Sequence, residues 1–153
     1  ACEAFFTEND LPFDRAQMDD GVLFTGCHET LDVRLWCGDF FDVPAERFGR
    51  FDACFDRASL IALPQPLQER HASSLRTLLS PGASGLLLGI DYDQSQRQGP
   101  PFSTPQKRVY DLLGEAFDLS VLQEEDLSGS EFAERMDLDR INEYCMSLER
   151  LGS

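Results

Sequence analysis

The amino-acid sequence predicts an α/β fold with a largely parallel β-sheet. Apolar strand-like segments alternate with helical segments through the middle of the chain, which is typical of βαβ units. Two of these apolar segments, 51–55 and 85–90, end abruptly in the polar runs Asp56-Arg57 and Asp91-Tyr92-Asp93. Ligands of open α/β sheets bind just beyond the carboxyl ends of the strands. We therefore expect the functional site where these two segments end.

The first part of the chain is expected to contain a helix and a hairpin. A helix over 1–9 is stopped by Asn9-Asp10-Leu11-Pro12. Strands are expected over 22–24 and 31–37, and the second alternates apolar and polar residues. The residues between them, 25–29, are expected to form the turn.

The middle of the chain supplies the first βαβ unit. The short apolar segment 51–55 is expected to be a buried strand, and 64–79 a helix with leucines along one side. Pro81-Gly82 is expected to end that helix. His71 is expected to pack within the helix interface and not to act as a catalytic base. The segment 85–90 is apolar on both faces, as an interior parallel strand is.

The last third continues the alternation, with one ambiguity. A helix is expected over 105–117, with proline in its first turn, and a strand over 119–123. Residues 141–148 fit both helical and strand spacing, and the pattern alone slightly favours a helix.

Composition restricts the classes of function. A chain of 153 residues fits one domain with a real core. The formal charge of −15 argues against nucleic acid and anionic membrane surfaces as partners, and favours a small-molecule substrate. No stretch approaches the ~20 apolar residues that span a bilayer.

All five cysteines are expected to be reduced thiols. They show no CxxC pair and no regular spacing. His28 and His71 are the only histidines, too few to complete a zinc site, so no metal is expected. Reduced thiols are consistent with a cytoplasmic protein.

Asp39 and Phe40 follow the strand-like segment 31–37 and are candidates for adenine recognition. A carboxylate can accept from an exocyclic amine while the next backbone N–H donates to a ring nitrogen. The alternative is that Asp39 simply caps a turn.

Three further positions are candidates for substrate contact. Arg57 directly follows a strand, so its guanidinium is expected to enter the ligand crevice, although a local ion pair with Asp56 is the alternative. The segment Gly99-Pro100-Pro101-Phe102 is stiff and has an aromatic tip, which suits either a lid over a planar substrate or a rigid connection into the next helix. Arg135 lies in an acidic segment, and a surface arginine is the alternative to the substrate contact that the family resemblance described below implies.

Together, at this spacing, Asp39-Phe40-Phe41-Asp42, Phe55-Asp56-Arg57 and Gly99-Pro100-Pro101-Phe102 resemble thiopurine S-methyltransferase. The resemblance implies a Rossmann-like class I methyltransferase sheet with helices on both faces, and a final antiparallel strand in place of the ambiguous helix. It implies S-adenosyl-L-methionine as cofactor, with Asp39, Phe40 and Arg57 in contact with it. It places Arg57, Arg135 and Phe102 at the methyl acceptor.

The implied activity is methyl transfer to a thiol or thione sulfur, or to selenium or tellurium species, by alignment of the two reactants and with no catalytic side chain. A thiol or halide-ion methyltransferase of the same superfamily and a catalytically silent Rossmann-like binding module are the alternatives. We expect a monomer that takes a small-molecule acceptor.

The family's amino-terminal part has no counterpart in this sequence. That part carries the first strands, the glycine-rich loop and the acidic residue that binds ribose. We therefore expect residues 1–153 to be a single methyltransferase domain that is amino-terminally truncated, and expect this polypeptide by itself to be unstable and inactive.

Overall fold

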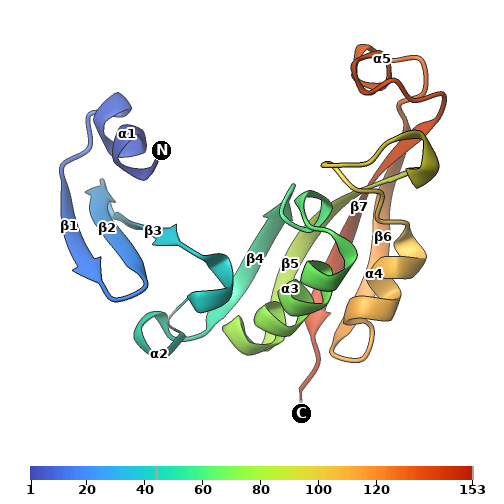
Figure 1. Cartoon of the computed structure of the whole chain (residues 1–153). Helices are drawn as coiled ribbons and strands as arrows, with labels where there is room; N and C mark the ends of the chain where they lie inside the picture. Colours follow the sequence, from blue (N-terminus) through green and yellow to red (C-terminus); the bar gives the residue numbers. More distant parts are fainter. Residues whose placement is uncertain (44, 153) are drawn as a thin grey trace. The chain divides into compact units, whose positions relative to one another are not determined.

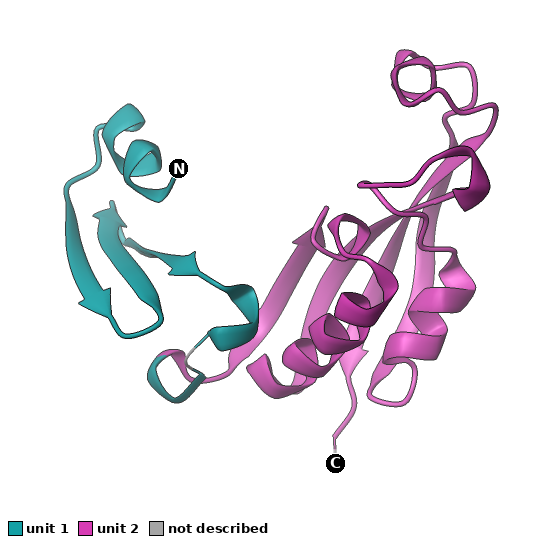
Figure 2. Cartoon of the chain, in the orientation of Figure 1, with its two compact units in different colours: residues 1–47 teal, residues 48–153 magenta. Residues whose placement is uncertain are grey.

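The computed structural model of the chain describes residues 1–43 and 45–152. The chain forms two compact units, Ala1–Arg47 and Phe48–Ser153, coloured separately in Figure 2. A single methyltransferase domain over 1–153 stays a prediction.

The first unit is a helix followed by a three-stranded antiparallel sheet with the order β1-β2-β3 (Figure 1). Its small core is aromatic: Phe6 is fully buried and stacks on Phe13, with ring centroids 5.1 Å apart. Its elements are α1 (Cys2–Glu8), β1 (Phe13–Met18), β2 (Gly21–His28), β3 (Leu31–Gly38) and the 3₁₀ turn η1 (Phe40–Asp42).

One strand of this unit was missed, and one expectation for it was wrong. β1 was missed because its sequence, FDRAQM, is mostly polar and mostly exposed, so it carries no apolar alternation. The predicted turn at 25–29 lies largely within β2, which pairs with β3 as far as His28↔Leu31. The hairpin turn is therefore the shorter Glu29-Thr30.

The second unit is a four-stranded sheet with the order β4-β5-β7-β6. β4 and β5 are parallel, and β7 is antiparallel to both of its neighbours, which confirms the final antiparallel strand and makes the sheet mixed. Its elements are α2 (Ala45–Phe48, at the unit boundary), β4 (Phe51–Arg57), η2 (Leu60–Ala62), α3 (Gln65–Leu78), β5 (Leu79–Tyr92), η3 (Gln94–Gln96), α4 (Gln106–Leu113), β6 (Phe117–Asp126), α5 (Glu131–Met136) and β7 (Ile141–Arg150).

α3 and α4 lie on one face of this sheet, and α5 packs on the other face near the start of β7 (Figure 1). Leu87 of β5 and Met146 of β7 pack in one apolar cluster with α3 and α4. Ile90 of β5 and Ile141 of β7 pack in a second cluster with Met136 of α5. Each of these two isoleucines lies an odd number of residues from Leu87 or Met146 on its own strand. Because side chains alternate between the faces of a strand, the two clusters lie on opposite faces.

β4 is an edge strand of this sheet and is not the buried strand that its apolar sequence predicted. Phe55 is 65% exposed and Leu86, its partner on β5, is 40% exposed. Cys54, on the other face, packs partly against the cluster under α3. Apolar character alone cannot distinguish a strand buried on both faces from one buried on a single face.

Two helix boundaries differ from the sequence-based expectation. α3 ends at Leu78 and β5 starts directly afterwards, so Pro81 and Gly82 lie inside the long strand, where Gly82 has a φ of +79°. α4 ends at Leu113, earlier than expected, because Phe117 already begins β6.

Candidate functional site

The carboxyl ends of β4 and β5 lie at one edge of the second unit. Arg57 closes the parallel ladder opposite Leu88, and β5 runs on past it to Tyr92. There Tyr92 pairs with Ile141, so the start of β7 reaches the same edge. This confirms that Arg57 and Asp91-Tyr92-Asp93 lie along one sheet edge, and it adds the residues around Ile141.

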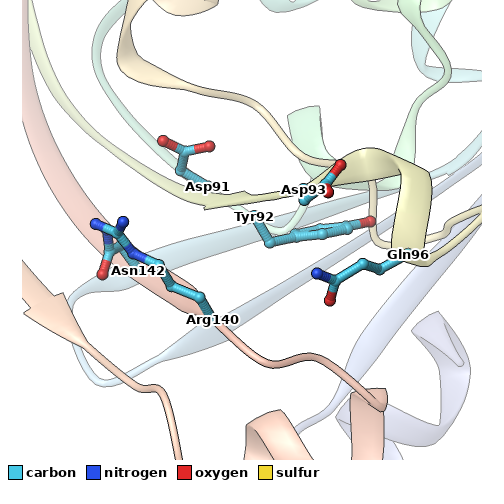
Figure 3. A pocket seen from close by; sticks show the side chains of 6 residues that line it. All are labelled: Asp91, Tyr92, Asp93, Gln96, Arg140 and Asn142. Atoms are coloured by element: carbon cyan, nitrogen blue, oxygen red, sulfur yellow. The ribbon is translucent and has the colours of Figure 1, made fainter.

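A pocket of about 470 Å³ lies at this edge (Figure 3). Carboxylates from the end of β5 and a guanidinium and an amide from the start of β7 line it, so a ligand meets hydrogen-bond donors and acceptors together. The Asp91 Oδ1 accepts from the Ser103 hydroxyl at 3.4 Å. Hydrogen bonds from the Ser95 side chain and from the Ser95 N–H, the latter at 3.0 Å, lower the pKa of Asp93. The lining residues are Asp91, Tyr92, Asp93, Gln96, Arg140 and Asn142.

The loop between β5 and α4 is held together by hydrogen bonds. Tyr92 donates its hydroxyl to the Pro101 carbonyl at 2.6 Å, and the Ser103 N–H donates to Gln94 Oε1 at 2.8 Å. The Phe102 N–H donates to the Ile61 carbonyl at 2.6 Å, which fixes the loop to the turn that follows β4. The prediction of a stiff segment at 99–102 agrees with this network.

Phe102 is half-buried and lines a second, smaller pocket of about 230 Å³. Gly99 has a φ of +79°, and a Cβ there would lie 2.6 Å from the Phe102 ring. Glycine therefore allows both the backbone conformation and the position of the ring. The other lining residues are Gln65, Gln68, Gln94, Arg97, Gln98 and Ser103.

The two predicted substrate arginines are both exposed. Arg135 lies on α5 with its guanidinium 5.8 Å from the centre of the Phe132 ring, a cation–π distance. The segment after α5 is tied to the β5–α4 loop, because Arg97 donates to the Met136 carbonyl at 3.3 Å and Gln96 to Asp139 at 3.4 Å. The contacts of Arg57 and Arg135 with an acceptor stay a prediction.

Asp56 does not form the local ion pair with Arg57 that was the alternative prediction. Its Oδ2 instead lies 2.6 Å from His71 Nε2 on α3. Both residues are buried, with 5% and 3% exposure. Because neighbouring residues of a strand point to opposite faces, Arg57 points away from this pair.

Asp39 and Phe40 belong to the first unit. Asp39 caps η1, where its Oδ1 accepts from the Phe41 N–H at 2.9 Å. Asp39 is exposed and Phe40 is 40% exposed. The capping role is therefore present, and contact with adenine stays a prediction.

Sequence reasoning missed the part of the site that comes from β7. Arg140 and Asn142 flank Ile141, in the segment whose spacing fitted both a helix and a strand. Only the antiparallel pairing with β5 brings them to the pocket. Their polar character at a strand start was the available signal.

Among residues 1–43 and 45–152, no cluster of three or more His, Cys, Asp or Glu side chains could hold a metal ion. No helix in those ranges has both the length and the apolar character to cross a membrane.

Two solved methyltransferase structures are similar to this chain. An arsenic(III) S-adenosylmethionine methyltransferase from Chlamydomonas reinhardtii matches with a TM-score of 0.54 and 16% identity, over 75% of this chain and 42% of that one. The N-methyltransferase NodS from Bradyrhizobium japonicum, in complex with S-adenosyl-L-homocysteine, matches with a TM-score of 0.50 and 14% identity, over 73% and 51%. The fold is therefore that of the class I methyltransferases.

Proteins of similar sequence identify the family, where the solved structures show only the fold. The thiopurine S-methyltransferase of Pseudomonas fluorescens (strain SBW25) is 41% identical over 84% of this chain and 57% of its own length. That of Pseudomonas syringae pv. pisi is 34% identical over 99% of this chain and 68% of its own length. The chain thus spans between about half and two thirds of these relatives. The family model of thiopurine S-methyltransferase matches residues 1–151, and the chain belongs to this family.

Proposed function

We propose that this protein transfers the methyl group of S-adenosyl-L-methionine to a sulfur acceptor, a thiol or thione of the thiopurine type. The observation that carries the proposal is the family match over residues 1–151 together with the class I methyltransferase fold. The polar edge at the ends of β4 and β5 supports it, because ligands of such sheets bind at that edge.

The residues of this chain fit one part of the cofactor. Adenine can donate its amine to an acceptor and pack on an apolar wall, and the exposed carboxylate of Asp39 beside the aromatic Phe40 offers both at a strand end. When bound, the cofactor supplies an activated methyl on a sulfonium. The side chains of this protein then have to bind the cofactor and the acceptor and align them with each other.

Arg57 and Arg135 are the proposed acceptor contacts. A guanidinium stays charged and presents several planar donors, so it can orient an anionic or electron-rich ring and offset its charge. Phe102 is the proposed apolar wall. Selenium and tellurium oxyanions are soft, anionic nucleophiles, so the same acceptor site would admit them. We further propose a monomeric, cytoplasmic protein, and the five free cysteines support the reducing compartment.

An acceptor panel on the natural full-length protein tests this function. We expect a thiopurine to be methylated, with the product identified by mass spectrometry. Methylation of halide ions or simple thiols alone would point to the related superfamily activity. Cofactor binding without turnover on any acceptor would point to a silent binding module, and absence of cofactor binding would reject the proposal.

A further inference from the structure

The buried contact between Asp56 and His71 connects the carboxyl end of β4 to α3. The His71 Nε2 to Asp56 Oδ2 distance is 2.6 Å. When the Asp56 carboxylate is ionised it can only accept, and Nε2 then donates the hydrogen of this bond. Asp56 directly precedes Arg57, the residue that the proposed function places at the methyl acceptor.

The Asp56 carboxylate depends on this contact. Its other oxygen, Oδ1, is buried and has no hydrogen-bond partner among the described residues. Burying a carboxylate without compensation is costly. The neighbouring Cys54 adds no compensation: burial, and then the charge of Asp56, raise the pKa of its thiol. His71 is therefore the side chain that compensates Asp56 in the described structure.

The end of β4 has few other attachments. In the described sheet β4 pairs on one side only, with β5, and the ladder ends at Arg57↔Leu88. Phe55 is mostly exposed on the face opposite α3. Ala58 then turns the chain with a φ of +69°, a conformation that is uncommon for a residue other than glycine. The Asp56–His71 contact is thus the polar attachment that holds this strand end on the helix layer.

We propose that Asp56 and His71 are positioning residues for Arg57. By holding the strand end on one face, they fix the direction in which the next side chain leaves on the opposite face, toward the ligand edge. This inference rests on the proposed function for its effect on methyl transfer. Its structural part, the attachment of residues 55–58, can be measured without any reaction.

The test uses the natural full-length protein. His71→Phe keeps a ring but removes the donor, and we expect it to lower kcat/KM for a thiopurine about tenfold or more. His71→Gln places an amide donor near the same position, and we expect it to stay within about threefold of wild type. In an Arg57→Ala background, His71→Phe should cause no further loss, because the pair acts through the arginine.

Leu75→Ala is the matched control. Leu75 lies one turn after His71 on the same face of α3 and is also buried, but it packs in the apolar cluster. It should destabilise the protein globally. Amide exchange measured by mass spectrometry should quicken at 55–58 in His71→Phe more than in Leu75→Ala.

Three results would overturn the inference: equal loss of kcat/KM in the two variants at equal stability, a further loss in the Arg57→Ala background, or unchanged exchange at 55–58 in His71→Phe. If the wild-type protein methylates no sulfur acceptor, the proposed function fails instead. The exchange experiment then still decides whether His71 holds the strand end.

Discussion

Single residues at the sheet edge show where sequence reasoning succeeds. The strand-end rule found Asp91, Tyr92 and Asp93, which line the larger pocket. His71 was correctly expected to be buried in helix packing. Its partner Asp56 could not be predicted, because the two lie 15 positions apart and only the packing of α3 on β4 joins them.

Tyr144 limits the stability of the second unit at alkaline pH. Burial raises the pKa of Tyr144 to about 12, and the charge of Asp91 acts in the same direction. Its hydroxyl donates to the Thr104 carbonyl. A folded pKa above the unfolded value near 10 means that the stabilisation is complete below about pH 10 and is lost as the pH rises toward 12.

We expect Tyr144→Phe to reduce this loss of stability at high pH. The wild-type free energy of unfolding should fall on the order of 2 kcal/mol more than that of the variant between about pH 9 and 12. Denaturant unfolding at several pH values measures it. Parallel curves for the two proteins would contradict the assignment to Tyr144.

Asp39 is expected to bind the adenine of the cofactor. Asp39→Ala in the full-length protein should weaken S-adenosyl-L-methionine binding by ~1–3 kcal/mol, the usual cost of leaving a polar group unpaired. Asp39→Asn keeps the η1 cap, since asparagine caps equally well, and replaces the charged acceptor with a neutral one. Calorimetry gives both affinities. An unchanged affinity in Asp39→Ala would remove this residue from the site.

At the scale of elements, most of the second unit was predictable. α3 and β6 lie where their patterns predict, with boundary shifts of a few residues, whereas β5 starts six residues earlier than expected, at Leu79. β7 was not determined by its pattern, since Leu138, Ile141, Cys145 and Leu148 also fit a helix. Pairing with β5 and β6 on both sides decides it, and such long-range pairing is invisible in a local window.

Arg57, at the end of β4, is expected to hold the acceptor. Arg57→Lys in the full-length protein should keep the fold but lower kcat/KM for a thiopurine about tenfold, which is about 1.4 kcal/mol of transition-state stabilisation. Arg135→Ala should cost less, because its guanidinium already contacts Phe132. Steady-state kinetics measures both.

Unfolding curves control for stability in these two variants. If both keep full turnover, the arginines do not hold the acceptor. Apolar contact with Phe102 would then be the better explanation of substrate selection.

At the scale of the whole molecule, the second unit leaves an apolar area uncovered. Phe55 and Leu86 are paired neighbours on adjacent strands and are 65% and 40% exposed. β4 also has an unpaired edge in the described sheet. Exposed apolar surface beside a free strand edge is a typical site of association.

We therefore expect the 153-residue polypeptide, expressed by itself, to bind a hydrophobic dye and to self-associate as its concentration rises. Phe55→Ser should reduce both effects. Ser84→Ala, an exposed change on the neighbouring strand, is the control and should leave them unchanged. Dye fluorescence and sedimentation measure the two properties. A monomeric, dye-free wild-type polypeptide would show that this surface is already covered.

The strand order also has a consequence for synthesis on the ribosome. β6 is made before β7, yet β7 is its hydrogen-bonded neighbour and separates it from β5. When β6 leaves the ribosome it has no partner, and β5 offers only the edge that β7 will occupy. The sheet is therefore completed late, when β7 inserts between β5 and β6. A premature stop codon between residues 127 and 141 would remove an inner strand, leave two edges open at once, and give the quality-control machinery of the cell a clear target.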